Sequence, residues 1–227
     1  ENEEMLNIEV LGNHFPTPIG IAAGFDKSAE VYNSLFKLGF GFVEVGTITP
    51  KRQLGNPKPR IFRLEKDNAL INRLGFNNDG LEIVYKRISE NTPIEVLGIN
   101  IGPNKSTKEK VEDFIVCFSK FYSKGDYITI NISSPNTEGL RNFHDKKELS
   151  ILLESLSKVK KEKKIDKPLF LKISPDINHS EVSNICELIS KYKIDGIILS
   201  NTSDRHRDNL LDQKKIEKGG LSGLPIQ

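Results

Sequence analysis

Six short apolar runs, each followed by a segment with helical character, constrain the fold of this 227-residue chain more than any other feature. The runs are nearly continuous in Ile, Val and Phe rather than alternating, which is typical of parallel strands covered on both faces. They lie at Ile19–Ala23, Phe42–Gly46, Val96–Ile101, Tyr127–Ile132, Leu169–Ile173 and Gly196–Leu199. Repeated strand–helix units predict an α/β fold with a parallel sheet.

Three later segments carry apolar residues at three- and four-residue spacing, as amphipathic helices do. These segments are residues 111–122, 149–159 and 182–192. The two cysteines, Cys117 and Cys186, fall at apolar positions of such segments, so we expect two buried, unpaired thiols.

A doubly wound sheet and a TIM (β/α)₈ barrel share this alternation of strands and helices. The residues at the ends of the predicted strands favour the barrel. Polar or glycine residues follow almost every strand, whereas a doubly wound sheet concentrates its site at one switch point. Only six βα units can be counted, so we expect one domain over residues 1–227, an incomplete barrel that lacks its last two units. Leu6–Phe15 is expected to form a small hairpin under the barrel. The irregular segment Lys51–Arg63 leads into Ala69–Asn77 and is expected to fold over the barrel mouth.

Composition excludes several classes of function. Lys and Arg number 33 against 31 Asp and Glu, which leaves no excess of basic charge for a nucleic-acid partner. No apolar run approaches the roughly 20 residues that a membrane-spanning helix needs. The four histidines show no metal-ligand spacing, so no metal is expected.

The densest group of candidate functional residues is the segment Asn131–Thr137, directly after a predicted strand. Its amides and hydroxyls offer directional donors and acceptors to a small polar ligand, although Ser, Pro and Asn are also common turn formers. Further asparagines follow in Asn72–Asn77, at Asn100 and in Ser200–Thr202. Amides that recur at strand ends suggest recognition of a planar ring with both N–H and C=O edges.

Two lysines and one glycine-rich segment complete the candidates. Lys27 and Lys172 lie near strand ends, and Lys172 is embedded in an apolar strand, where a charge is costly without an opposite charge. Either a carboxylate of the protein, in a structural ion pair, or an anionic ligand would supply that opposite charge. Gly219–Gly223 is expected to be a loop whose backbone N–H groups could face a phosphate.

Taken in order, these segments resemble the successive signatures of dihydroorotate dehydrogenases. The similarity rests on Ala22–Lys27, Gly46–Pro50, Asn72–Phe76, Asn131–Thr137, Lys172, Ser200–Thr202 and Gly219–Gly223. The resemblance implies a TIM barrel that holds FMN at its C-terminal mouth and oxidises dihydroorotate to orotate.

The resemblance also implies a role for each matching residue. Ser134 occupies the position of the catalytic base, with Thr137 and Phe76 as a proton relay and Lys172 favouring the reduced flavin. The implied flavin contacts are Ala23, Gly24, Thr47, Asn100, Asn131, Lys172, Ser200 and Gly223. The implied substrate contacts are Lys27, Asn72, Arg73, Gly75, Phe76, Asn131, Asn136, Asn201 and Thr202.

A serine rather than a cysteine at position 134 is similar to the quinone-reducing members of the family. This similarity implies a quinone partner and peripheral contact with the cytoplasmic face of a membrane, through a segment outside this chain. Two alternatives stay open, namely a sibling FMN barrel that acts on another pyrimidine and a truncated remnant without catalytic activity.

Overall fold

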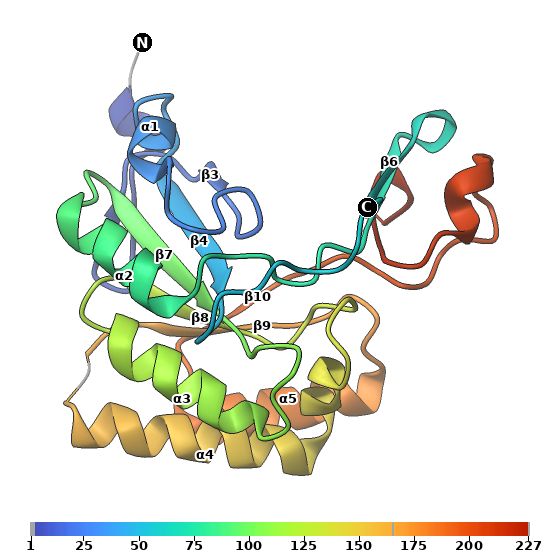
Figure 1. Cartoon of the computed structure of the whole chain (residues 1–227). Helices are drawn as coiled ribbons and strands as arrows, with labels where there is room; N and C mark the ends of the chain where they lie inside the picture. The colour runs from blue at the N-terminus through green and yellow to red at the C-terminus, as the bar shows by residue number, and fades with distance from the viewer. Residues whose placement is uncertain (1–2, 165, 227) are drawn as a thin grey trace.

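The centre of the protein is a six-stranded parallel sheet that curls like an arc of a barrel (Figure 1). The computed structural model describes residues 3–164 and 166–226. The strands lie in the order β10-β9-β8-β7-β4-β3, which follows the chain without reversal. This order confirms the barrel topology, since a doubly wound sheet reverses at its switch point. The strands are β3 (Gly20–Ile21), β4 (Phe42–Ile48), β7 (Val96–Ile101), β8 (Tyr127–Asn131), β9 (Leu169–Lys172) and β10 (Gly196–Ile198).

The helices lie on the convex side of the sheet, where α3, α4 and α5 pack side by side (Figure 1). They are α1 (Tyr32–Phe36), α2 (Leu81–Glu90), α3 (Lys110–Phe121), α4 (Lys146–Glu162) and α5 (His179–Tyr192), and the three helical segments predicted from spacing are confirmed. Side-chain caps fix where two of these helices begin. Asp145 accepts hydrogen bonds from two backbone N–H groups of α4, and Asn178 forms a capping box with Glu181 at α5.

The main hydrophobic core fills the space between the sheet and these helices. Phe114, Phe118 and Phe121 point from α3 into this core and are at most 1% exposed. Every residue of β7 is buried, as expected for a central strand covered on both faces. Burial of each such large apolar side chain stabilises the fold by about 1.5–3 kcal/mol, so the outer face of the sheet is a rigid support for the loops at its ends.

The prediction for the two cysteines is half right. Cys117 is buried in α3, but Cys186 is exposed, so the expectation of a second buried thiol is wrong. Ile185 and Leu188 form the buried face of α5, whereas Val182 lies one turn before Cys186 and is 40% exposed. Helical spacing reveals an apolar stripe, but it does not reveal which part of the stripe a neighbouring element covers.

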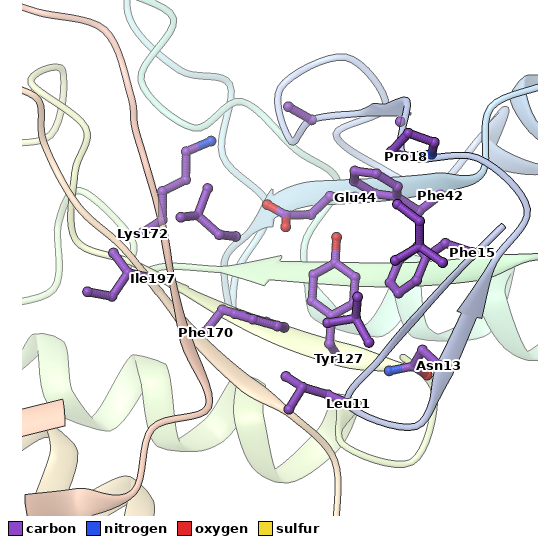
Figure 2. Close-up of a pocket in the computed structure, with 15 residues that line it drawn as sticks. Leu11, Asn13, Phe15, Pro18, Phe42, Glu44, Tyr127, Phe170, Lys172 and Ile197 are labelled. Atoms are coloured by element: carbon purple, nitrogen blue, oxygen red, sulfur yellow. The ribbon is translucent and has the colours of Figure 1, made fainter. Parts of the chain in front are cut away.

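The expected hairpin is present and borders an apolar cavity inside the arc. Strands β1 (Ile8–Val10) and β2 (Asn13–Phe15) pair antiparallel. Figure 2 shows the cavity of about 430 Å³, with the rings of Phe15, Phe42 and Tyr127 gathered on one side. Short 3₁₀ helices occupy Glu3–Leu6 (η1), Glu65–Asp67 (η2), Leu140–His144 (η3), Gln213–Ile216 (η4) and Leu224–Ile226 (η5).

A second, antiparallel sheet extends to one side of the arc (Figure 1). It consists of β5 (Ile61–Leu64), β6 (Ala69–Asn72) and β11 (Gly220–Gly223), with β6 in the middle. The expectation that residues 219–223 form an open glycine-rich loop is therefore wrong. Residues 220–223 are paired with β6, although β11 is the edge strand of this sheet and only one side of its backbone faces β6.

None of the helices in the described ranges combines the length and the apolar character needed to cross a membrane.

Candidate active site

Most of the candidate residues meet around one cavity of about 230 Å³ at the carboxyl ends of the barrel strands. Ser134, Asn72 and Lys172, which come from three separate elements, share this cavity. Its lining consists of Ala23, Gly24, Lys27, Thr47, Asn72, Leu74, Gly75, Phe76, Asn131, Ser134, Asn136, Lys172, Asn201 and Thr202. Of these residues, only Leu74 was not given a role from the sequence.

Three candidates lie behind or beside the cavity rather than on its wall. Asn100 is fully buried and accepts a hydrogen bond from the hydroxyl of Thr47 at 2.6 Å. Thr137 is also buried, and its hydroxyl has no hydrogen-bond partner among the described residues. Ser200 is exposed, and its hydroxyl donates to the neighbouring carbonyl of Asn201.

Arg73, which directly follows β6, and Gly223, which lies in β11, are not part of the cavity wall. Arg73 forms an ion pair with Glu217 at 2.7 Å and stacks on the ring of Phe62 at 4.4 Å. Gly223 pairs with Ala69 across the sheet. Both residues lie in segments that resemble the family signatures. In the structure, however, Arg73 forms an ion pair with Glu217, and Gly223 lies in strand β11.

The loop after β8 presents the hydroxyl of Ser134 to the cavity. Ser134 is 6% exposed, and its oxygen accepts a hydrogen bond from the backbone N–H of Asn136 at 3.2 Å. Asn136 in turn donates from its amide nitrogen to the backbone carbonyl of Asn72 at 3.0 Å. This contact joins the serine loop to the end of β6.

Three amide side chains that were given no role from the sequence, two of them buried, hold residues 72–78 in place. Gln53 donates to the carbonyl of Gly75 at 2.9 Å, and Asn78 donates to the carbonyl of Phe76 at 2.9 Å. Asn104 donates to the side-chain oxygen of Gln53 at 3.2 Å. Asn78 directly follows the segment Asn72–Asn77, and Gln53 lies in the irregular segment Lys51–Arg63, but neither residue was named as a candidate.

The two predicted lysines differ in their surroundings. Lys172 is 7% exposed, and no carboxylate of the described residues comes within 4.0 Å of its ammonium group. Figure 2 shows its amine reaching away from the apolar rings. Lys27 donates to Asn77 at 3.2 Å, and burial, with a smaller contribution from Arg60, lowers its pKa to about 8. The cavity therefore contains cationic groups without a full set of protein counter-charges.

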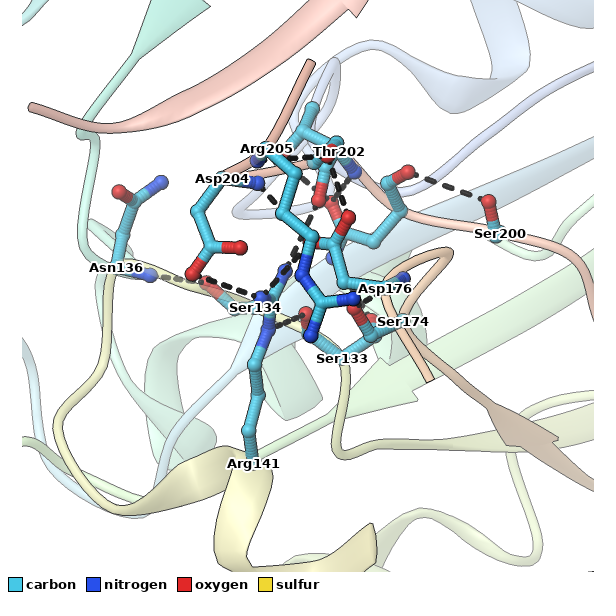
Figure 3. A network of polar contacts seen from close by, with 12 residues as sticks. Ser133, Ser134, Asn136, Arg141, Ser174, Asp176, Ser200, Thr202, Asp204 and Arg205 are labelled. Carbon is cyan, nitrogen blue, oxygen red and sulfur yellow. Dashed lines mark hydrogen bonds and ion pairs between the residues drawn. The ribbon is translucent and has the colours of Figure 1, made fainter. Parts of the chain in front are cut away.

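A polar network on one flank ties the serine loop to residues 202–204 (Figure 3). The guanidinium of Arg141 donates to the backbone carbonyls of Ser133 and Thr202, both at 3.1 Å. It also lies 3.0 Å from the carboxylate of Asp176 and 3.1 Å from that of Asp204. One side chain thereby fixes the backbone on both sides of the cavity.

Asp176 is the buried anchor of this network. Burial opposes its ionisation, but hydrogen bonds from Ser203 and Asp204 and the charge of Arg141 keep its pKa below the ordinary value. His144 lies beside this network, and its Nε2 has no hydrogen-bond partner in the described part of the chain. Burial, with help from Arg141, lowers the pKa of His144.

The donor set fits an anionic, planar cofactor better than a metal ion. At Gly24, where φ is +112°, a Cβ atom would meet nothing within 4 Å, so the backbone faces open space at the cavity. The unpaired Lys172 supplies positive charge nearby. Within the described residues, no group of three His, Cys, Asp or Glu side chains could hold a metal ion.

Comparison with known proteins gives the family. A family model described as dihydroorotate dehydrogenase matches residues 5–227. The chain belongs to this family. The solved structures agree with this membership, since the ferulenol complex of DHODH from Eimeria tenella superimposes with a TM-score of 0.91 at 40% sequence identity. That match covers 99% of this chain and 66% of the Eimeria chain.

Two curated relatives place the chain within the family. It is 46% identical over 228 residues to the dihydroorotate dehydrogenase (quinone) of Bartonella tribocorum, and 45% identical over 230 residues to the mitochondrial dihydroorotate dehydrogenase (quinone) of Cyclocybe aegerita. Each match covers 99% of this chain. The chain spans 63% of the Bartonella relative and 70% of the Cyclocybe relative.

Proposed function

We propose that this chain forms the flavin- and substrate-binding region of a quinone-reducing dihydroorotate dehydrogenase, which oxidises dihydroorotate to orotate. The observation that carries the proposal is the convergence of Ser134, Asn72 and Lys172 on one cavity. The family and the names of the relatives agree with this chemistry.

The cavity suits a compact polar ring. Its volume of about 230 Å³ is smaller than the roughly 300–1,000 Å³ of pockets for drug-sized ligands. Asn72, Asn136 and Asn201 supply amide donors and acceptors that match the N–H and C=O edges of a pyrimidine. Lys27 supplies a cation for the carboxylate of dihydroorotate.

Ser134 is proposed to take the proton from C5 of dihydroorotate. A serine hydroxyl is a weak base, so the proton needs an onward acceptor. The hydroxyl of Thr137, three residues away, is buried and lacks a partner among the described residues, which leaves it able to bond a relay water. Phe76, which is 7% exposed, would wall this path from solvent.

FMN is the proposed cofactor, and when bound it supplies the acceptor for the hydride that leaves C6. The residues proposed to hold it are Ala23, Gly24, Thr47, Asn100, Asn131, Lys172, Ser200 and Gly223. Of these, Lys172 contributes most of the electrostatics, because a buried ammonium without a protein counter-charge favours an anionic ligand. Electrons are proposed to pass onward to a quinone at a membrane surface.

The test is reduction of bound flavin by dihydroorotate in an anaerobic stopped-flow experiment. Ser134→Ala should still quench FMN fluorescence and bind orotate, but flavin reduction should slow by about 10²–10⁴-fold. Ser174→Ala is the matched control, since Ser174 is also a buried serine at a strand end and does not line the cavity. Unchanged flavin reduction in Ser134→Ala would remove Ser134 from the mechanism, and a chain that binds neither FMN nor orotate would overturn the proposal.

A further inference from the structure

Besides Lys172, the sheet contains a second buried charge at Glu44 of β4, which is 3% exposed and lies between the buried residues Val43 and Val45. One of its oxygens accepts a hydrogen bond from the amide of Asn100 at 2.8 Å, and the other accepts from the hydroxyl of Thr129 at 2.8 Å. Figure 2 shows the carboxylate inside the arc. Because a carboxylate only accepts hydrogen bonds, Asn100 must turn its nitrogen toward Glu44 and its oxygen away.

This orientation continues through a line of five buried or half-buried hydrogen bonds that all donate toward Glu44. In order of donation the line joins Asn201, Ser133, Asn131, Thr47, Asn100 and Glu44, with donor–acceptor distances of 2.8, 2.7, 2.8, 2.6 and 2.8 Å. Three of these residues, Asn201, Asn131 and Thr47, line the cavity. The line therefore reaches from the inside of the barrel to the candidate active site.

The half of the line that is farther from Glu44 is held by two additional hydrogen bonds from backbone N–H groups. The backbone N–H of Ser133 donates to the oxygen of Asn131 at 3.1 Å, and that of Thr202 donates to the oxygen of Asn201 at 2.8 Å. Asn100 has no such anchor, because among the described residues its side chain bonds only to Glu44 and Thr47. Glu44 alone thus decides which way the Asn100 amide faces.

The consequence falls on the hydroxyl of Thr47. It donates its hydrogen to Asn100 and accepts from Asn131, which leaves one lone pair free at the cavity wall. If the Asn100 amide turned round, Thr47 would meet two N–H donors, and its own hydrogen would turn toward the cavity. The same hydroxyl would then present a donor instead of an acceptor.

We propose that Glu44 is a positioning residue that keeps Thr47 an acceptor for a ring N–H of the flavin. This inference rests on the function proposed above, in which Thr47 contacts the flavin. Glu44 acts only through Asn100 and touches neither cofactor nor substrate. The required property is an oxygen directed at Asn100, and the negative charge itself is not required.

Glu44→Gln and Glu44→Asp separate these two properties. The glutamine keeps an oxygen for Asn100, and its NH₂ group can donate to Thr129, whose hydroxyl accepts as well as donates. The aspartate keeps the charge but is one methylene too short to reach Asn100. We expect the FMN dissociation constant, measured by fluorescence quenching, to stay within about 3-fold in Glu44→Gln and to rise about 10-fold in Glu44→Asp, as for an unpaired buried amide.

Thr129→Val is the control, since it removes a different hydrogen bond to Glu44 and leaves the contact with Asn100 intact. Its FMN dissociation constant should be unchanged. A role in stability alone would lower the melting temperatures without separating the flavin affinities of the two Glu44 variants. If Glu44→Asp does not fold, Glu44→Met, which keeps the volume and loses both oxygens, takes its place.

Two results overturn the inference. One is the reverse order, in which aspartate preserves FMN affinity and glutamine loses it, because charge would then be the required property. The other is equal affinity in both variants. A chain that fails to bind FMN before any substitution would instead overturn the proposed function, so the two failures can be distinguished.

Discussion

The guanidinium of Arg141 lies 3.0 Å from the carboxylate of Asp176, 35 positions further along the chain, and the side chain of Asp176 is only 3% exposed. Asp176→Asn should therefore lower the free energy of unfolding by about 3 kcal/mol, the low end for a broken buried pair, because Asp204 still faces the arginine. Urea denaturation measures this change.

The comparison for that loss is the exposed ion pair between Lys146 and Glu187, which spans 2.6 Å on the outer helices. Glu187→Gln should change the free energy of unfolding by less than about 1 kcal/mol, because solvent screens the pair. Similar values for Asp176→Asn and Glu187→Gln would mean that the network beside the cavity is no stronger than a surface contact.

The lowered pKa of Asp176 also predicts how acid acts on the fold. The unfolded chain protonates this carboxyl near its ordinary value of 3.8, whereas the folded chain holds it ionised to lower pH. The stabilisation is therefore complete above that value and is lost as the pH falls through the lowered pKa. The difference in unfolding free energy between the wild type and Asp176→Asn should shrink below about pH 4. A difference that does not depend on pH would contradict the assignment.

The arc of the barrel and most of the cavity wall could be predicted from the sequence because both depend on local pattern. The apolar runs predicted the six strands. The polar residues at the ends of these runs identified Asn131, Ser134 and Asn201 as candidates. Parallel strands end at the same edge of the sheet, so side chains at their ends meet without any knowledge of the helices.

The residues that were missed depend on contacts between distant segments. Gln53 lies in the irregular segment Lys51–Arg63 and Asn104 follows a predicted strand, but no local pattern shows that the two side chains meet across 51 positions. Glu44 could have been found, because the argument applied to Lys172 in an apolar strand applies equally to a glutamate between Val43 and Val45. Cys186 was misplaced since spacing alone does not say which side of a helix is covered.

Gly75 should be required for ligand binding and not only for stability. Its φ is +73°, and an added Cβ would lie 2.8 Å from the amide nitrogen of Asn56. Gly75→Ala should therefore weaken orotate binding by about 10-fold, the effect of losing one well-placed hydrogen bond, as calorimetry would measure. Gly39→Ala is the control, since Gly39 has φ +95° and open space around it. If both variants bind orotate like the wild type, the loop is not held by Gly75.

The two thiols should react at very different rates. Burial raises the pKa of Cys117, and the thiol is inaccessible, whereas Cys186 is exposed on α5. An aromatic disulfide reagent should modify one thiol per folded chain and both thiols after unfolding. Cys186→Ser should abolish the reaction of the folded chain, and Cys117→Ser should leave it unchanged. Rapid modification of both thiols in the folded chain would show that α3 is not packed on the sheet.

Because of Lys27, orotate should bind more weakly as the pH becomes alkaline. Its pKa of about 8 means that the ammonium form predominates at neutral pH and is lost as the pH rises through that value. An anionic ligand binds the charged form, so its dissociation constant should be constant below about pH 7 and rise by up to tenfold per unit above about pH 8. Calorimetry of orotate binding from neutral to alkaline pH measures this rise of the dissociation constant.

The control for this pH dependence is Lys27→Arg, because a guanidinium stays protonated throughout the range. The variant should bind more weakly where its different shape breaks the contact with Asn77, but its affinity should not change between pH 7 and pH 9.5, roughly the window set by the lowered pKa. A rise of the dissociation constant that persists in Lys27→Arg would assign the titration to another group. A flat profile in the wild type would remove the Lys27 ammonium from the recognition of the carboxylate.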